Sequence, residues 1–182
     1  MLRKQDVRGS MPRFDIVGQL GSLRRYARSL TRDSAEAEDL VHDALVRAYE
    51  RRGTFRSGGN LRAWLLSIVH NAFIDGLRSR KSEAARVEQA GYLADASMQA
   101  PQEHSVRLAQ VREAFFKLPD EQRSALHLVA IEGLTYSQAA EASGVPLGTL
   151  MSRIGRARAA LREMEEKLPA HAKSHLKIVG GP

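Results

Sequence analysis

The stretch Thr135–Arg162, TYSQAAEASGVPLGTLMSRIGRARAALR, decides the fold class of this chain. It contains a short helical segment, a turn around Gly144, and a longer helical segment that starts at Pro146. Thr135 followed by Gln138 predicts a capping box at the start of the first helix. A glycine in the turn and a proline at the next start suit the end of one helix and the beginning of another. These lengths predict a helix-turn-helix.

The second helix of this motif has two contrasting faces. An apolar stripe at steps of three and four predicts packing on the preceding helices, and its members are Leu147, Leu150, Ile154, Ala157 and Leu161. The opposite face carries Gly148, Thr149, Ser152 and Arg156, with Arg153 and Arg158 on its flanks. Small residues permit close approach to base edges, and arginine binds guanine or phosphate. The alternative is that this is merely a solvated basic face. Such faces usually mix both charges, however, and residues 145–162 contain no acid.

Other long segments of the chain are also predicted to be helical. Aromatic residues make up only 5% of the 182 residues, and Ala, Leu, Arg and Glu recur at spacings of three and four. Helices are expected from Asp33, with Glu36 as a capping-box partner, to about Arg51, and from Leu61 to about Lys81. Another is expected from Pro119, as its first residue, to Gly133, and the last from Pro146 to about Leu168. Residues 53–60 are expected to form a loop.

The predicted fold class is all-α, with two small helical domains joined by a flexible linker. The first domain is expected at residues 12–81 and the second at 105–168. Lower apolar density predicts the linker at 82–104, and residues 169–182 form a basic tail.

The helix from Asp33 is unusually acidic for a protein of net charge +7. Between Asp33 and Glu50 there are six acidic residues and one arginine. Its buried stripe is predicted to be Ala37, Leu40, Val41, Ala44, Leu45 and Ala48. Because the acidic face would repel DNA, it is expected to face solvent or a basic protein partner.

The helix from Leu61 also has two faces. Its core side is predicted to be Leu66, Val69, Phe73 and Leu77, whereas Trp64, Asn71, Asp75 and Arg78 share another face. An amide such as Asn71 can read a base edge, and Phe55 in the adjoining loop can stack on a base. Trp64 is expected to be at least half structural.

Two segments resemble the extracytoplasmic-function family of bacterial sigma factors. The stretch LPDEQRSALHLVAIEGLTYSQAAEASGVPLGTLMSRIGRARAALREM resembles region four, whose pattern is matched by Pro146, Gly148, Thr149, Ser152, Arg153, Arg156, Ala157 and Arg158. Met151 and Gly155 depart from that pattern. The run AEDLVHDALVRAYE resembles region two, with His42 in place of a common Gln and Asp43 in place of a common Glu.

The resemblance implies four sets of contact residues. Binding to the clamp of the largest subunit of core RNA polymerase is expected of Asp39, Leu40, His42 and Asp43. Recognition and melting of the minus-ten promoter element is expected of Phe55, Arg56, Ser57, Asn60, Asn71 and Arg78. Recognition of the minus-thirty-five element is expected of Gly148, Thr149, Ser152, Arg153 and Arg156. Phosphate contacts are expected of Arg62, Arg78, Arg80 and Lys81.

The function expected from the resemblance is promoter-specific transcription initiation in the cytoplasm, in a stress or envelope response. An anti-sigma factor is the expected inhibitor. No catalytic residue, cofactor, metal or membrane insertion is expected, since the chain has no cysteine, no nucleotide-binding loop and no apolar stretch of spanning length. His42 and Asp39 lack a second histidine at ligand spacing. The alternative is a sigma-like decoy that sequesters an anti-sigma factor without driving transcription.

Overall fold

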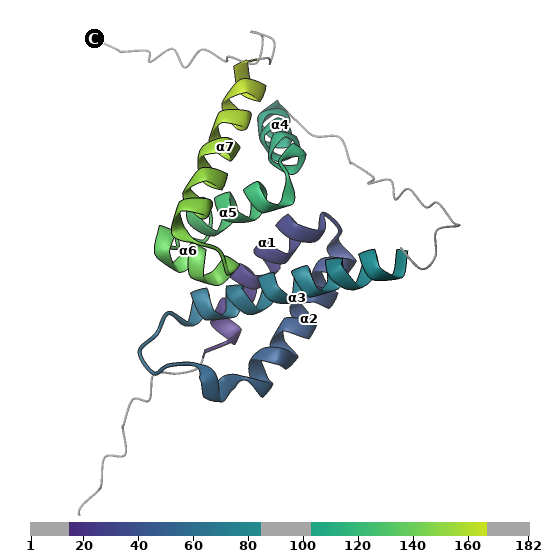
Figure 1. Ribbon diagram of the computed structural model, residues 1–182. Helices are drawn as coiled ribbons and strands as arrows, with labels where there is room; N and C mark the ends of the chain where they lie inside the picture. Colours follow the sequence, from purple (N-terminus) through teal and green to yellow (C-terminus); the bar gives the residue numbers. More distant parts are fainter. Residues whose placement is uncertain (1–14, 85–102, 167–182) are drawn as a thin grey trace, which may run out of the picture.

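A computed structural model describes residues 15–84 and 103–166 of the chain, and these residues form helices and no strand (Figure 1). The all-α prediction is confirmed. The α-helices are α1 Leu20–Thr31, α2 Ser34–Glu50, α3 Leu61–Ala84, α4 Glu103–Lys117, α5 Asp120–Ala130, α6 Tyr136–Ser143 and α7 Leu147–Glu166. Two short 3-10 turns are η1 Val17–Gln19 and η2 Arg52–Thr54. Most of the predicted linker and all of the predicted tail lie outside the described residues.

The helices α1, α2 and α3 pack against one another as one group. The side of α2 that faces its neighbours is made of small residues, namely Ala37, Val41, Ala44 and Ala48, all of them buried. Small side chains let α1 and α3 approach α2 closely, so that large residues such as Tyr26 and Leu66 fill the space between them. Leu40 and Leu45, predicted for the same stripe, are only half-buried and pack at its edge.

The second group places α5 and α6 against α7, with α4 touching α7. Its centre is formed by Leu128, Leu150, Ile154 and Ala157, all nearly inaccessible to solvent. The predicted stripe of α7 is therefore confirmed at three positions, and Leu161 packs at its edge. Leu147 is the exception. It is 47% exposed and is the first residue of α7.

Local signals place the ends of α6. Thr135 Oγ1 accepts a hydrogen bond from the Gln138 backbone N–H at 3.2 Å, and Gln138 Oε1 accepts one from the Thr135 N–H at 3.0 Å. The predicted capping box is confirmed. Gly144 ends the helix at a φ of 64°, a left-handed conformation that favours glycine.

Other predicted helix ends differ slightly from the structure. Asp33 caps α2 at 2.9 Å, but the Glu36 carboxylate lies 3.4 Å from Arg80 instead of completing a capping box. Pro119 is the N-cap of α5 instead of its first residue, and α5 ends at Ala130, before Gly133. Likewise α7 starts at Leu147, one residue after Pro146. The ends of the predicted linker are helical, since α3 reaches Ala84 and α4 begins at Glu103.

The two helical groups also pack on each other. α1 lies against α5, and α3 lies against α6, so the helix-turn-helix rests on the helix that carries Asn71 (Figure 1). This arrangement connects segments that are about a hundred residues apart in the sequence.

Candidate functional site

The face of α7 that was predicted to read DNA is open to solvent. Gly148, Thr149, Ser152 and Arg156 are all exposed, on the side of the helix away from the buried Leu150 and Ile154. Apart from the backbone of its own helix and its chain neighbours, no atom lies within 4 Å of where a side chain at Gly148 would begin, so this part of the helix can approach another surface closely. The Ser152 hydroxyl donates to the Gly148 carbonyl at 2.9 Å, which leaves its oxygen able to accept a further bond.

Arg153 lies differently from the other predicted DNA contacts. It is half-buried, and its Nη2 lies 2.9 Å from Glu121 Oε2 on α5. In this structure Arg153 therefore joins α7 to α5, and its role in DNA binding stays a prediction. Met151 is 54% exposed and lies beside the small residues of the face that was predicted to read DNA.

The loop before α3 is held by local contacts. The Phe55 ring lies 5.4 Å from the Trp64 ring at an interplanar angle of 55°, so the predicted stacking residue is seated against the helix that it precedes. Asn60 Oδ1 accepts a hydrogen bond from the Ala63 backbone N–H at 3.1 Å, which fixes the start of α3. Arg56 and Ser57 are exposed between these two fixed points. The loop thus has anchored ends and an accessible centre.

The face of α3 that follows this loop is partly accessible. Asn71 and Arg78 are exposed, as a contact with DNA requires, while Trp64 is half-buried. Asp75 shares this face but bonds to Arg47 of α2, with Nη1 to Oδ2 at 2.7 Å. Arg47 also reaches Asp43 at 3.0 Å, and the hydrogen bonds from these two carboxylates raise the pKa of Arg47. Arg47 therefore fixes α2 relative to α3.

The acidic face of α2 is exposed at the positions predicted to bind a protein. Asp39, His42 and Asp43 are exposed, and Leu40 is half-buried at the edge of this surface. Glu38 lies 2.9 Å from Arg24 and 3.6 Å from Arg28 of α1, so part of the acidity is neutralised within the chain. The negative surface is thus narrower than the count of acidic residues suggested.

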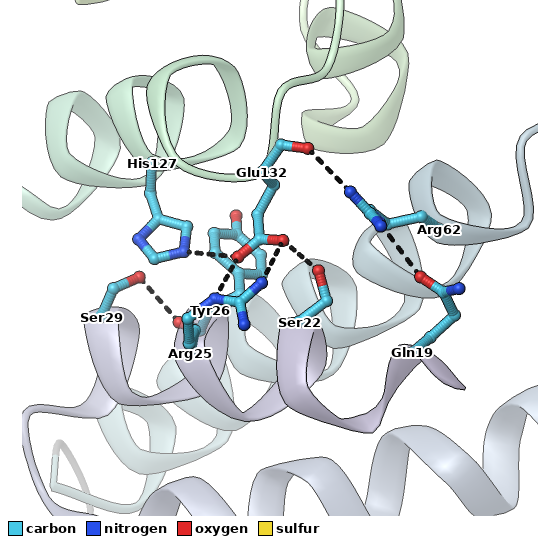
Figure 2. Close-up of polar contacts among 8 residues, drawn as sticks. All are labelled: Gln19, Ser22, Arg25, Tyr26, Ser29, Arg62, His127 and Glu132. Carbon is cyan, nitrogen blue, oxygen red and sulfur yellow. Dashed lines mark hydrogen bonds and ion pairs between the residues drawn. The ribbon is translucent and has the colours of Figure 1, made fainter. Parts of the chain in front are cut away.

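A buried polar cluster that the sequence analysis did not predict joins the two groups of helices (Figure 2). Glu132, which follows α5, has a fully buried side chain. Its carboxylate accepts hydrogen bonds from the Ser22 hydroxyl and from Arg25, whose Nε and Nη2 each lie at 3.2 Å, and it lies 3.3 Å from His127 Nε2. Burial alone would raise the pKa of Glu132, but the hydrogen bonds from His127, Ser22 and Arg25 lower it to about 2.

Arg123 makes a second connection between the groups. Its fully buried guanidinium donates to the carbonyls of Ser29 at 2.5 Å and Leu30 at 3.2 Å, both in the last turn of α1. Within its own group it donates to the Leu118 carbonyl at 2.9 Å and to Asp120 Oδ1 at 2.7 Å. Together these contacts form an interdomain network of Ser22, Arg25, Ser29, Leu30, Arg123, His127 and Glu132.

Burial also changes the titration of two neighbouring groups. Tyr26 of α1 is completely buried, and its hydroxyl lies 2.8 Å from His70 Nδ1 of α3. Burial raises the pKa of Tyr26 and, together with the positive charge of Arg153, lowers the pKa of His70 to about 4. His70 is therefore neutral at neutral pH. The sequence contains one signal of the buried cluster around Glu132, because Glu132 is the only acid within the apolar run LHLVAIEGL.

Two other features bear on the kind of site. Among residues 15–84 and 103–166, no three His, Cys, Asp or Glu side chains are grouped so as to hold a metal ion. None of the helices in this part of the chain is long and apolar enough to cross a membrane.

Comparisons with known proteins agree with both halves of this arrangement. The family model for sigma-70 region 2 matches residues 17–83, and that for sigma-70 region 4 matches residues 108–161. The ECF RNA polymerase sigma factor EcfG of Rhodopseudomonas palustris is 38% identical over 149 residues, which cover 82% of each chain.

Solved structures show the same likeness. The sigma factor RpoE of Bartonella quintana, in complex with the anti-sigma factor NepR, has 32% identity and a TM-score of 0.73, covering 85% of this chain and 96% of that one. CnrH, in complex with the cytosolic domain of CnrY, has 27% identity and a TM-score of 0.60, covering 87% and 90%. The chain therefore belongs to the ECF family of RNA polymerase sigma factors.

Proposed function

We propose that the chain binds core RNA polymerase through α2 and places α3 and α7 on two promoter elements. One observation supports this most strongly: a single chain presents an exposed acidic surface on α2 and, in residues 147–162 of α7, an exposed face with arginines and no acid. Asp39, His42 and Asp43 would contact a basic surface of the polymerase clamp, with Leu40 adding an apolar contact at the edge.

For the minus-thirty-five element, α7 would enter the major groove. Gly148 and Ser152 permit close approach, Thr149 and Ser152 offer hydroxyls to base edges, and Arg156 bonds to guanine or phosphate. Arg153 would act first as a brace, because its bond to Glu121 fixes the angle of α7 on α5.

For the minus-ten element, the accessible centre of the loop and the exposed face of α3 would hold an extruded base. Removing a base from the stack costs a few kcal/mol, and stacking plus hydrogen bonds to the base can offset this cost. Phe55 would offer its ring and Asn71 its amide, while Arg56, Ser57 and Arg78 contact the backbone. Asn60 would act by fixing the start of α3, as its bond to Ala63 indicates.

We also propose the bounds of the two domains and the kind of protein that regulates the chain. The region-two domain would span residues 12–81 and the region-four domain 105–168, both in the cytoplasm where core polymerase is found. Because RpoE was solved in complex with the anti-sigma factor NepR, an anti-sigma factor is the regulator we propose, in a stress or envelope response.

Footprinting of the reconstituted holoenzyme tests this proposal. We expect protection of two separated promoter segments and opening of the downstream one. Phe55→Ala and Asn71→Ala should impair opening on duplex DNA but recover on a pre-melted template, since that template removes the cost of extrusion. Failure of the pre-melted template to rescue Phe55→Ala would contradict the stacking role, and absence of any core-dependent footprint would contradict the function.

A further inference from the structure

The first turns of α7 have two unlike sides. Because a helix has 3.6 residues per turn, side chains three and four residues apart lie in rows along its surface. One row is polar and cationic, and its members are Thr149, Arg153 and Arg156. The other row, the apolar edge, consists of Leu147 and Met151. Between the two rows lie the small residues Gly148, Ser152 and Gly155. Within residues 147–156 the positive charge is therefore confined to one side of the exposed face.

The apolar edge is open to contact. Leu147 is 47% exposed and Met151 is 54% exposed. One turn before and one turn after Met151, its neighbours on the exposed side are Gly148 and Gly155, which carry no side chain. Apart from the backbone of the helix and the chain neighbours, no atom lies within 4 Å of where a side chain at either glycine would begin. A surface laid against α7 would thus meet Met151 before it met the helix backbone.

The chemistry of DNA limits what such a side chain can contact. Phosphates and most groups on the base edges form hydrogen bonds or ion pairs, which a thioether chain cannot match. In the major groove, the apolar group that base pairs present is the C5 methyl of thymine. Burying Met151 in a DNA complex is therefore favourable only where it meets such a methyl group.

The length of the apolar edge fits more than one base pair. Leu147 and Met151 are four residues apart, which is about 6 Å along the helix axis. Successive base pairs in duplex DNA are about 3.4 Å apart. The edge is long enough to cover two neighbouring base pairs when α7 lies along the groove.

We propose that Met151 is a specificity-determining residue of the minus-thirty-five contact, where it recognises the C5 methyl of a thymine, and that Leu147 extends this contact to a neighbouring base pair. The inference rests on the proposed function, in which α7 enters the major groove, and it adds the identity of a base. Removing one methyl-sized group from an apolar contact should weaken binding about fourfold.

Uracil substitution tests the proposal directly, because uracil differs from thymine only in lacking the C5 methyl. Each thymine of the minus-thirty-five element would be replaced by deoxyuridine, one at a time, and binding of the reconstituted holoenzyme would be measured. The parent chain and Met151→Ala would be compared on the same templates, so that any effect of uracil on DNA shape cancels between them. Met151 is more than half exposed, so its replacement should leave the fold intact.

Three further variants separate the contact from a general loss of apolar surface. Val111→Ala removes an apolar side chain of matched exposure, 55%, from α4, which is outside the face predicted to read DNA. Met151→Leu keeps an apolar side chain and should keep the sensitivity to uracil. Met151→Lys should remove that sensitivity and steepen the slope of log affinity against log salt by about one, because a cation at the DNA surface releases a counterion. An unchanged slope would overturn the proposal, since it would place this position away from DNA.

We expect the parent and Val111→Ala to lose binding about fourfold at one uracil position or at two neighbouring ones, and Met151→Ala to be insensitive there. Equal losses in the parent and Met151→Ala at every position would overturn the proposal, as would an element without thymine. Absence of any binding to the upstream element would contradict the proposed function and this inference with it, whereas binding without a difference at uracil contradicts the inference alone.

Discussion

Arg123 offers the sharpest test of what holds the two groups of helices together. Its side chain is completely buried and makes four hydrogen bonds, three of them to backbone carbonyls of Ser29, Leu30 and Leu118. Arg123→Met would keep much of the apolar stem but leave these carbonyls without their donor. Each orphaned buried group costs about 1–3 kcal/mol, and partial access of water to the widened site reduces the sum to about 3–5 kcal/mol.

Asp120, the fourth acceptor of Arg123, also lies near Arg32, which provides a matched control. Asp120 bonds to Arg123 at 2.7 Å and lies 3.8 Å from Arg32, whose side chain is about half exposed. Because exposed ion pairs contribute about 0–1 kcal/mol, Arg32→Met should change the free energy of unfolding by less than about 1 kcal/mol. Urea unfolding followed by circular dichroism measures both variants. A cost for Arg123→Met no larger than that for Arg32→Met would refute the structural role given to the buried guanidinium.

Three further predictions follow from other parts of the structure. Folding lowers the pKa of His70 from 6.5 to about 4, so the unfolded chain binds more protons between these pH values, and the free energy of unfolding should fall by about 3 kcal/mol as the pH drops from 6.5 to 4. Folding also lowers the pKa of Glu132 from 4.5 to about 2, which adds a further loss of stability below pH 4.5. Urea midpoints measured against pH test this, and a flat profile would contradict it. Thr135→Ala should cost about 1 kcal/mol by removing half of the capping box, and a melting temperature equal to that of the parent would argue against it. Arg156→Ala should weaken binding to the minus-thirty-five element while core association is kept, and Asp39→Arg should do the reverse. Co-purification with core and DNA binding would be measured for both variants. If either variant lost both activities, the two surfaces would not be separate.

The helix-turn-helix could be predicted in detail because its signals are local. Thr135 and Gln138 are three residues apart, and Gly144 needs only its own backbone conformation to end α6. The exposure of Leu147 could not be predicted from periodicity, since the position of the first helical residue relative to the covering helix is a tertiary property. The acidic surface of α2 was likewise predicted by charge, but its ion pairs with α1 and α3 were not.

Helix α1 was missed because it lacks the usual end signals. Its N-cap Gln19 makes no side-chain hydrogen bond, and its C-cap Arg32 adopts a φ of 65° where a glycine is more usual. Two partners of Glu132, Ser22 and Arg25, lie more than a hundred residues away in α1, so no spacing rule connects them to it. The residue types and the helix faces of the candidate site could therefore be predicted from the sequence. The contact of Arg153 with α5 and the burial of Glu132 could not, because both depend on how the helices pack.

Runoff transcription from a promoter library, with purified core polymerase and the purified chain as the only proteins, tests whether this chain directs transcription initiation. We expect transcripts that appear only when the chain is added, from templates sharing two elements at a constant spacing. We also expect their loss in Asp39→Arg even on the best template. Binding to core without any promoter-dependent transcript would contradict this function and would favour a decoy that occupies an anti-sigma factor.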